Sequence, residues 1–385
     1  MAQSRQSHRL LSVTLDVWNI GSQDPRGVVN LKHQYAQAAA LLVEADQLQV
    51  CYAGDETDRK WLLEKELLGR NRFRYFRIPG RLQRLMPNLG FLPVSGMLGS
   101  ADLYHIARAY PFRNGRTRVI GTLIDFVPMR VPEFVPLAFT SEQVQWCHWA
   151  TRHPDARWIA ISEQTKQDAL TLGRLQNDQV SMVYPGVDDD IFFQPPPKEV
   201  NSILESLGIR QPYLLYVSTL NLRKNHIGLL EAWEKGGWAK QGWSLVLVGH
   251  PAGHPLVEKI QSGIFEGVKW LGYVPRQKLV HLYYGCEAFI YPSLYEGFGI
   301  PVAEAVVAGK AVLTSRRSAM TEITRDGAVY IDPWDTQSLI EGLDELIKNE
   351  TLRKDLAEYN TARRQNFSMQ RVADDLMQVY KRYAV

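Results

Sequence analysis

The chain has 385 residues, of which 45% are hydrophobic and 22% are charged, an ordinary composition for a folded globular protein. Lys and Arg number 44 and Asp and Glu number 41, so the formal net charge of +3 gives no indication of nucleic-acid binding. The three cysteines, Cys51, Cys147 and Cys286, are far apart and form no CxxC pair. This argues against a disulfide framework or a structural zinc site, and it favours the cytoplasm.

Short β-prone runs alternate with helical patterns through the first half of the chain. The first strand is expected at 10–17, and it is not read as a signal peptide because Asp16 interrupts its apolar run. Further strands are expected at 47–53, 118–124, 157–162 and 180–186, and helices at 30–45 and 163–173. Strands that alternate with helices favour a parallel, doubly wound sheet.

The alternation restarts after residues 184–199, a segment whose three consecutive prolines and acidic residues suit an extended linker. Strands are then expected at 213–218, 243–249, 268–274, 288–293 and 311–315, with helices at 226–236, 278–286, 302–309, 334–350 and 368–385. The sequence therefore predicts two Rossmann-like α/β domains, 1–190 and 191–367, each built on a doubly wound sheet.

Two glutamates, Glu296 and Glu304, flank Gly-Phe-Gly-Ile-Pro in the second domain. Residues 288–293 predict a buried strand, and a helix is expected to begin at Pro301 and to be capped by Gly309. Glu296 then lies at the carboxyl end of a strand and Glu304 in the first turn of the helix, where doubly wound sheets bind ligands. Carboxylates accept hydrogen bonds from adjacent hydroxyls, so the pair suits the two sugars of a sugar nucleotide. Taken alone, the pattern also fits an ordinary helix start.

A second strand, loop and helix at 216–233 carries Arg223 and Lys224 side by side. Adjacent cations at a strand end suit a diphosphate, because Arg offers a planar fork and Lys a compact charge. An isolated pair of this kind is more typical of a solvated loop. Its presence in one domain with the two glutamates favours diphosphate binding.

The segments STLNLRKN (218–225) and YPSLYEGFGIPVAEA (291–305) together resemble the retaining glycosyltransferases of family 4, which have an E-x7-E motif and the GT-B fold. The resemblance extends from about residue 118 to the end of the chain. It implies two Rossmann-like domains that face each other across a cleft. The first domain takes the acceptor and the second takes the donor, and the last helix, about 368–385, packs back on the first domain.

The resemblance implies four residues that act on the reacting groups. Glu296 is expected to meet the hydroxyls of the donor hexose, and Arg223 and Lys224 are expected to neutralise the leaving diphosphate. Asp125 is the retained member of a family segment, here TLIDFVPM, in which Ile124 stands at a position commonly occupied by histidine.

The resemblance also implies the residues that line the donor, namely Gly27, Ser218, Tyr273, Val274, Gly297, Phe298, Gly299 and Glu304. Glu304 is expected to bind the nucleotide ribose, and Tyr273 with Val274 to edge the nucleobase. Gly27 lies in PRGVVN, which resembles the phosphate-facing glycine loop of the first domain, although Val29 stands where a second glycine is usual.

These features predict a hexosyltransferase that uses a nucleoside-diphosphate sugar, with GDP-mannose as the first candidate, and a glycan or glycolipid hydroxyl as acceptor. No metal or other cofactor is expected, because no Asp-x-Asp sequence stands out at a strand end and the acidic run Asp188–Asp190 lies in the linker. The alternatives are a sugar phosphorylase, an epimerase or a non-catalytic sugar-nucleotide-binding subunit. A two-carboxylate glycosidase fits less well, because it would not need the cation pair.

An arginine-rich stretch, Arg70–Arg84, contains six arginines interleaved with aromatic residues. It fits either a strand with a solvated basic face or a peripheral contact with an anionic membrane that presents a lipid-linked acceptor. Nucleic acid is not expected, because no RNA-binding signature accompanies it. His105, which follows an expected strand, is either a site residue or, more typically for a single histidine, a structural one.

Overall fold

The structure is a computed structural model that describes residues 9–17, 19–21, 28–69, 71–75, 101–107, 118–135, 137–253 and 255–384. The chain divides into two compact units. The N-terminal unit consists of Met1–Met129, Ala138–Pro185 and Met369–Val385, and the C-terminal unit of Arg130–Leu137 and Gly186–Ser368. The chain thus passes into the C-terminal unit at Gly186, a few residues before the boundary expected from the sequence, and returns to the N-terminal unit at Met369.

The N-terminal unit contains a parallel sheet with the strand order β3-β2-β1-β4-β5-β6-β7 in the described residues. Its strands are β1 (Leu11–Asp16), β2 (Leu48–Gly54), β3 (Arg72–Tyr75), β4 (Leu103–Ile106), β5 (Arg118–Leu123), β6 (Arg157–Ala160) and β7 (Val180–Met182). Its helices include α1 (Val28–Glu44), α2 (Glu56–Glu64), α6 (Leu137–Thr151) and α7 (Glu163–Thr171), and the short α5 (Val127–Arg130) lies at its boundary.

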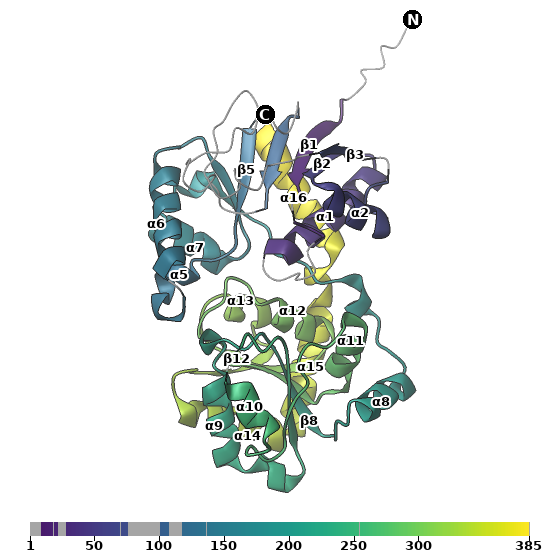
Figure 1. The fold of residues 1–385 in the computed structure, drawn as a ribbon, viewed down its shortest axis with the longest axis vertical. Helices are drawn as coiled ribbons and strands as arrows, with labels where there is room; N and C mark the ends of the chain where they lie inside the picture. Colours follow the sequence, from purple (N-terminus) through teal and green to yellow (C-terminus); the bar gives the residue numbers. More distant parts are fainter. Residues whose placement is uncertain are drawn as a thin grey trace, which may run out of the picture. The chain divides into compact units, whose positions relative to one another are not determined.

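The last helix, α16 (Met369–Ala384), belongs to the N-terminal unit and packs against α1, beside which it lies in Figure 1. Its buried side chains recur every three to four residues, as on one face of an amphipathic helix. The hydroxyl of Tyr380, on this face, forms a hydrogen bond with His105 Nδ1 at 2.7 Å. The spacing of the apolar residues in this helix therefore specifies which face is buried.

The C-terminal unit contains a second parallel sheet, with the strand order β10-β9-β8-β11-β12-β13 in the residues described. Its strands are β8 (Tyr213–Val217), β9 (Ser244–Val248), β10 (Val268–Trp270), β11 (Ala288–Tyr291), β12 (Ala311–Ser315) and β13 (Ala328–Ile331). Its helices include α8 (Pro197–Ser206), α9 (His226–Gly236), α10 (Leu256–Gln261), α11 (Arg276–Gly285), α12 (Ile300–Val307), α13 (Met320–Thr324), α14 (Thr336–Lys348) and α15 (Glu350–Arg363).

The strand order of the second sheet reverses between β8 and β11, which pair in parallel at its centre. Every residue of β11 and β12 is buried, as expected of central strands covered by helices on both faces. In doubly wound sheets, the carboxyl ends of the two strands at such a reversal form the usual ligand site. The loops that follow β8 and β11 carry the cation pair and the first glutamate.

Candidate functional site

The cation pair lies on a short turn between β8 and α9. Residues Leu222–Lys224 form a single 3-10 turn, and the Asn221 side chain caps it by accepting a hydrogen bond from Arg223 N at 2.9 Å. Asn225 then adopts a left-handed conformation with φ 57° and directs the chain into α9. Asparagine is well suited both to side-chain capping and to the left-handed conformation. The local sequence therefore holds Arg223 and Lys224 at the carboxyl end of β8.

The glutamate loop leaves β11 at Tyr291 and enters α12 through Gly299, whose φ of 111° favours glycine. The helix begins at Ile300, so Pro301 is its second residue and not its first. Glu304 is consequently the fifth residue and lies beyond the first turn, which corrects the expectation from the sequence. Gly309, with φ 65°, follows the last turn as expected of a residue that ends a helix.

The two loops meet at one carboxylate oxygen, Glu296 Oε1. It lies 2.9 Å from Arg223 Nη1 and 2.5 Å from Lys224 Nζ. Ser293 Oγ donates to the same oxygen at 2.5 Å. Among the described residues, none donates a hydrogen bond to the second oxygen, Oε2. Residues more than 70 positions apart in sequence therefore share one ionic cluster.

The charge of Glu296 is fixed by its surroundings. The side chain is 7% exposed, and burial by itself would raise the pKa of the carboxyl. The positive charges of Arg223 and Lys224, together with the hydrogen bonds from Lys224 and Ser293, outweigh burial and lower that pKa to about 2. Glu296 is thus ionised at neutral pH. Two cations around one carboxylate leave a net positive charge, which suits an anion such as a diphosphate.

Two tyrosines that the sequence patterns did not identify form hydrogen bonds with the cluster of Arg223, Lys224 and Glu296. Lys224 Nζ donates to Tyr291 OH at 2.8 Å, and Tyr291 OH in turn donates to Glu296 Oε1 at 3.4 Å. Tyr216 OH donates to the backbone oxygen of Lys224. Burial, together with the charge of Glu296, raises the pKa of both phenols well above 10, so they remain neutral donors. Their positions at the ends of strands next to the two motifs are the signal that could have revealed them.

Glu304 lies in a separate cluster with Arg276 and Tyr283. Its Oε1 accepts a hydrogen bond from Arg276 Nη1, and its Oε2 accepts one from Tyr283 OH at 2.7 Å. Arg276 also forms a bidentate pair with Asp190, with Nε–Oδ2 at 3.0 Å and Nη2–Oδ1 at 2.7 Å. Burial raises the pKa of Glu304, and the charge of Arg276 opposes this rise. Arg276 was not identified from the sequence.

The other donor-lining candidates of the C-terminal unit differ in exposure. Val274, Phe298 and Ser218 are buried, and Ser218 Oγ donates to Thr219 O at 3.0 Å. Tyr273 is 73% exposed, which leaves its ring available for stacking. Gly297 lies between Glu296 and Phe298 in the same buried loop. All of these residues follow the carboxyl ends of strands β8, β10 or β11.

In the N-terminal unit, Asp125 follows β5 next to the half-buried Ile124, and its Oδ1 accepts a hydrogen bond from Val127 N at 3.1 Å. Gly27 lies outside the described residues, as do Arg70 and most of the stretch up to Arg84. His105 is fully buried, its Nε2 lies 2.9 Å from Thr122 Oγ1, and burial lowers its pKa to about 3. It is therefore a structural histidine and not a site residue.

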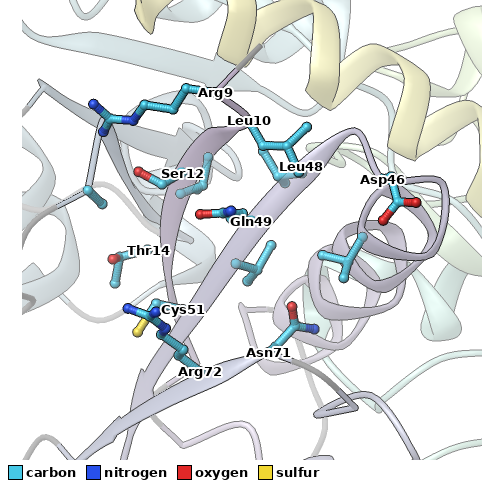
Figure 2. A pocket seen from close by; sticks show the side chains of 14 residues that line it. Arg9, Leu10, Ser12, Thr14, Asp46, Leu48, Gln49, Cys51, Asn71 and Arg72 are labelled. Atoms are coloured by element: carbon cyan, nitrogen blue, oxygen red, sulfur yellow. The ribbon is translucent and has the colours of Figure 1, made fainter. Parts of the chain in front are cut away.

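A cavity of about 490 Å³ lies in the N-terminal unit. Figure 2 shows Ser12, Gln49 and Arg72 among its lining residues, and these belong to the amino-terminal parts of β1, β2 and β3. Doubly wound sheets bind ligands at the opposite, carboxyl ends of their strands. We therefore do not include this cavity in the candidate site.

Solved structures share the fold of this chain. A glycosyltransferase from Rickettsia africae ESF-5 matches 98% of this chain and 99% of its own with a TM-score of 0.72 and 15% identity. Anabaena HepE, solved in complex with UDP and glucose, matches 97% of this chain and 100% of its own with a TM-score of 0.70 and 17% identity. The fold is that of the GT-B glycosyltransferases, which confirms the fold predicted from the sequence.

Sequence comparisons agree with the resemblance that the motifs indicated. Residues 201–363 match the family model described as glycosyl transferases group 1. O-antigen chain mannosyltransferase B of Escherichia coli is 26% identical over 228 residues, which cover 58% of this chain and 60% of the relative. The chain thus spans about three fifths of the length of the curated relatives that it matches.

Two further observations apply to the described residues as a whole. None of the helices in the described residues has the length and apolar character required to cross a bilayer. Within the same residues, no three His, Cys, Asp or Glu side chains are grouped so that they could hold a metal ion.

Proposed function

We propose that the protein is a retaining glycosyltransferase that works without a metal ion. It moves a hexose from a nucleoside-diphosphate sugar to a hydroxyl of a glycan or glycolipid. The observation that carries the proposal is the cluster in which Arg223, Lys224 and Glu296 meet at the reversal of the second sheet. It combines positive charge for a diphosphate with a carboxylate for sugar hydroxyls.

The cation pair accounts for the catalytic part of the proposal. When the bond between the anomeric carbon and the diphosphate oxygen breaks, negative charge grows on the leaving group. Arg223 and Lys224 are held by Glu296 and by Tyr291 before the donor arrives, so little reorganisation is needed when this charge develops. The acceptor oxygen forms the new bond on the same face of the sugar, and its proton passes to the departing diphosphate.

Glu296 accounts for the orientation of the sugar. One of its oxygens is used by the cations, and the other is available to accept hydrogen bonds from hexose hydroxyls. The following loop, Gly297–Gly299, enters α12 through Gly299, whose positive φ favours a residue without a Cβ. Asp125 of the N-terminal unit remains a proposed member of the site on the basis of the sequence resemblance.

GDP-mannose is the first candidate donor. The match to the Escherichia coli mannosyltransferase supports mannose, whereas the Anabaena neighbour was solved with UDP and glucose. Donors with guanine and donors with uracil should therefore both be tested. The nucleobase would lie against Tyr273 and Val274, and Gly27 remains a proposed contact of the donor phosphates.

The acceptor and the location are proposed from the sequence. The cysteine pattern supports the cytoplasm, and Arg70–Arg84 supports a peripheral contact with an anionic membrane. Replacement of Arg77, Arg81 and Arg84 by glutamate should abolish sedimentation with anionic liposomes. Unchanged sedimentation would remove the membrane contact from the proposal.

Release of nucleoside diphosphate from a panel of GDP, UDP, ADP and dTDP sugars, in buffer with EDTA, tests the function. We expect the parent protein to release diphosphate from at least one donor and Glu296→Gln to release it at least about 100-fold more slowly. Glu287→Gln is the matched control, because Glu287 precedes the same strand at its other end and forms an ion pair with Arg353 at 3.6 Å, away from the cation pair and Glu296.

The same assay separates the alternatives. A non-catalytic binding subunit would bind a donor without releasing diphosphate, and a phosphorylase would need inorganic phosphate. Retention predicts that the first sugar product seen by NMR has the anomeric configuration of the donor. An inverted product, or activity that disappears with EDTA, would contradict the proposal.

A further inference from the structure

We propose that Arg276 is a positioning residue of the nucleotide site. It orients Glu304 toward the ribose and is itself fixed by Asp190, which belongs to the segment where the chain enters the C-terminal unit. The inference rests on the proposed function, because it takes Glu304 as the residue that binds the ribose of the donor.

The guanidinium of Arg276 uses all three of its nitrogens. Nε and Nη2, which lie on one edge of the fork, contact the two oxygens of Asp190 at 3.0 and 2.7 Å. Nη1, on the other edge, donates to Glu304 Oε1. A planar fork held at one edge by a carboxylate has little freedom to rotate, so its remaining donor points in one direction.

Helix α11 fixes both oxygens of the Glu304 carboxylate. Arg276 is the first residue of this helix, and Tyr283 lies seven positions later, about two turns along the same face. Tyr283 OH donates to Oε2 at 2.7 Å while Arg276 binds Oε1. The plane of the carboxylate is therefore set by one rigid element, and each oxygen retains a lone pair for a ribose hydroxyl.

The charges around Glu304 show why the arginine matters. The groups that face this carboxylate are Arg276, Tyr283 and Asp188, with Asp190 behind the guanidinium. Burial and the negative charge of Asp188 both raise the pKa of Glu304, and Arg276 lowers it. Without the arginine, Glu304 would take up a proton at higher pH and lose part of its capacity to accept hydrogen bonds from the ribose.

A purely structural ion pair would behave differently. If Arg276 served only to fasten residues 188–190 to the C-terminal unit, its loss would lower stability. It would leave the affinity for a nucleotide, and the pH dependence of that affinity, unchanged in molecules that remain folded. The pH profile therefore distinguishes a positioning role from a fastening role.

Calorimetric titration of GDP and UDP into the full chain, at about pH 6 and about pH 8, tests the inference. The variants are Arg276→Gln, Arg276→Lys and Asp190→Asn. Arg59→Gln is the matched control, because Arg59 forms an ion pair with Glu56 at 3.5 Å in the N-terminal unit. Thermal unfolding of each variant verifies that the protein is folded at the titration temperature.

We expect Arg276→Gln to weaken the better-bound nucleotide by roughly tenfold at the higher pH and by more at the lower pH, relative to the parent protein. Arg276→Lys should restore part of the affinity, since it keeps the charge but not the fork. Asp190→Asn should weaken binding by a few-fold at both pH values. A loss for Arg276→Gln that is under about twofold, or equal at both pH values, would overturn the inference.

Glu304→Gln separates this inference from the function on which it rests. If Glu304→Gln loses affinity while Arg276→Gln keeps it, the role of Arg276 is wrong and the proposed nucleotide site stands. If Glu304→Gln binds GDP and UDP as the parent protein does, the ribose contact is wrong and both fail.

Discussion

At the scale of single residues, the candidate site places one carboxylate between two cations. Glu296 holds Arg223 and Lys224 in place through Oε1, yet it neutralises only half of their charge. A fully neutral cluster would have no attraction for a diphosphate, and two half-buried cations without a carboxylate between them would repel each other. The arrangement therefore combines a positioned pair of donors with a remaining positive charge.

The first prediction concerns the contribution of Glu296 to stability. Its pKa is lowered in the folded state to about 2, from 4.5, so the folded protein binds fewer protons than the unfolded chain between these values. The ionised carboxylate should therefore stabilise the fold by about 3 kcal/mol above pH 4.5, and this contribution should fall as the pH drops toward 2.

Urea unfolding of the parent protein and of Glu296→Gln, followed from neutral pH down to about pH 4, measures this difference. The gap in unfolding free energy between the two proteins should be constant above pH 5 and should begin to narrow below about pH 4.5. A gap that widens as the pH falls would show that the sign of the pKa shift is wrong.

The sequence indicated the residues proposed to act on a ligand but not those that hold them in place. Glu296, Arg223 and Lys224 were predicted because their motifs follow strand ends, and the structure brings them within hydrogen-bonding distance. Arg276 was missed because its partners, Asp190 and Glu304, lie 86 and 28 positions away. Nothing in the local pattern of an arginine after a proline indicates such distant partners.

At the scale of elements, the passage from β11 into α12 determines where the glutamates lie. Gly299 has φ 111° and caps the helix, and an added Cβ would come within 2.5 Å of Met320 Cε. The neighbouring methionine could move, but the backbone conformation would remain strained for any other residue. The short loop between Glu296 and Gly299 thus depends on one glycine.

We expect Gly299→Ala to lower the unfolding free energy by roughly 1–3 kcal/mol and also to reduce turnover of the donor sugar. Gly237→Ala is the control, because Gly237 has φ 64° at the end of α9 with no atom within 4 Å of the added Cβ. It should lose stability without losing turnover. Equal turnover in the two variants would show that the loop geometry is not needed for the reaction.

The position of Glu304 shows the limit of sequence analysis at this scale. Proline favours the first turn of a helix, but that preference does not decide between its first and second positions. The helix begins one residue earlier than expected, at Ile300, and Glu304 shifts into the second turn. The strand and helix themselves were predicted well, since buried runs and amphipathic runs alternate clearly.

At the scale of the whole molecule, the chain enters the C-terminal unit at Gly186 and leaves it at Ser368, and these two segments pair within that unit. Val187 N donates to Phe367 O at 2.9 Å. Phe367 also packs edge-on against Phe298 of the glutamate loop, with ring centroids 6.3 Å apart. The segments that connect the units are therefore built into the surroundings of the candidate site.

We expect Phe367→Ala to lower the unfolding free energy by about 3–5 kcal/mol, because it leaves a cavity beside the glutamate loop. Phe193→Ala is the matched control, since Phe193 lies on the entering segment and is 73% exposed. It should change stability by less than about 0.5 kcal/mol. Similar denaturation midpoints for the two variants would contradict the packing role of Phe367.

The fold class was accessible from the sequence at this scale, because strands that alternate with helices favour parallel, doubly wound sheets. The sequence did not predict that residues 130–137 belong to the C-terminal unit. This segment includes Phe134, whose ring lies 6.1 Å from that of Trp334. Two aromatic residues 200 positions apart leave no periodic signal that would predict their contact.

The proposed function requires that Lys224 and Arg223 take the place of a metal at the diphosphate. Calorimetry with a nucleoside diphosphate and the matching monophosphate, in the presence of EDTA, tests it on the parent protein and on Lys224→Met. A lost charge-assisted contact should weaken the diphosphate by roughly 10- to 100-fold and leave the monophosphate nearly unchanged. Equal losses for the two ligands, or no loss for either, would contradict the claim.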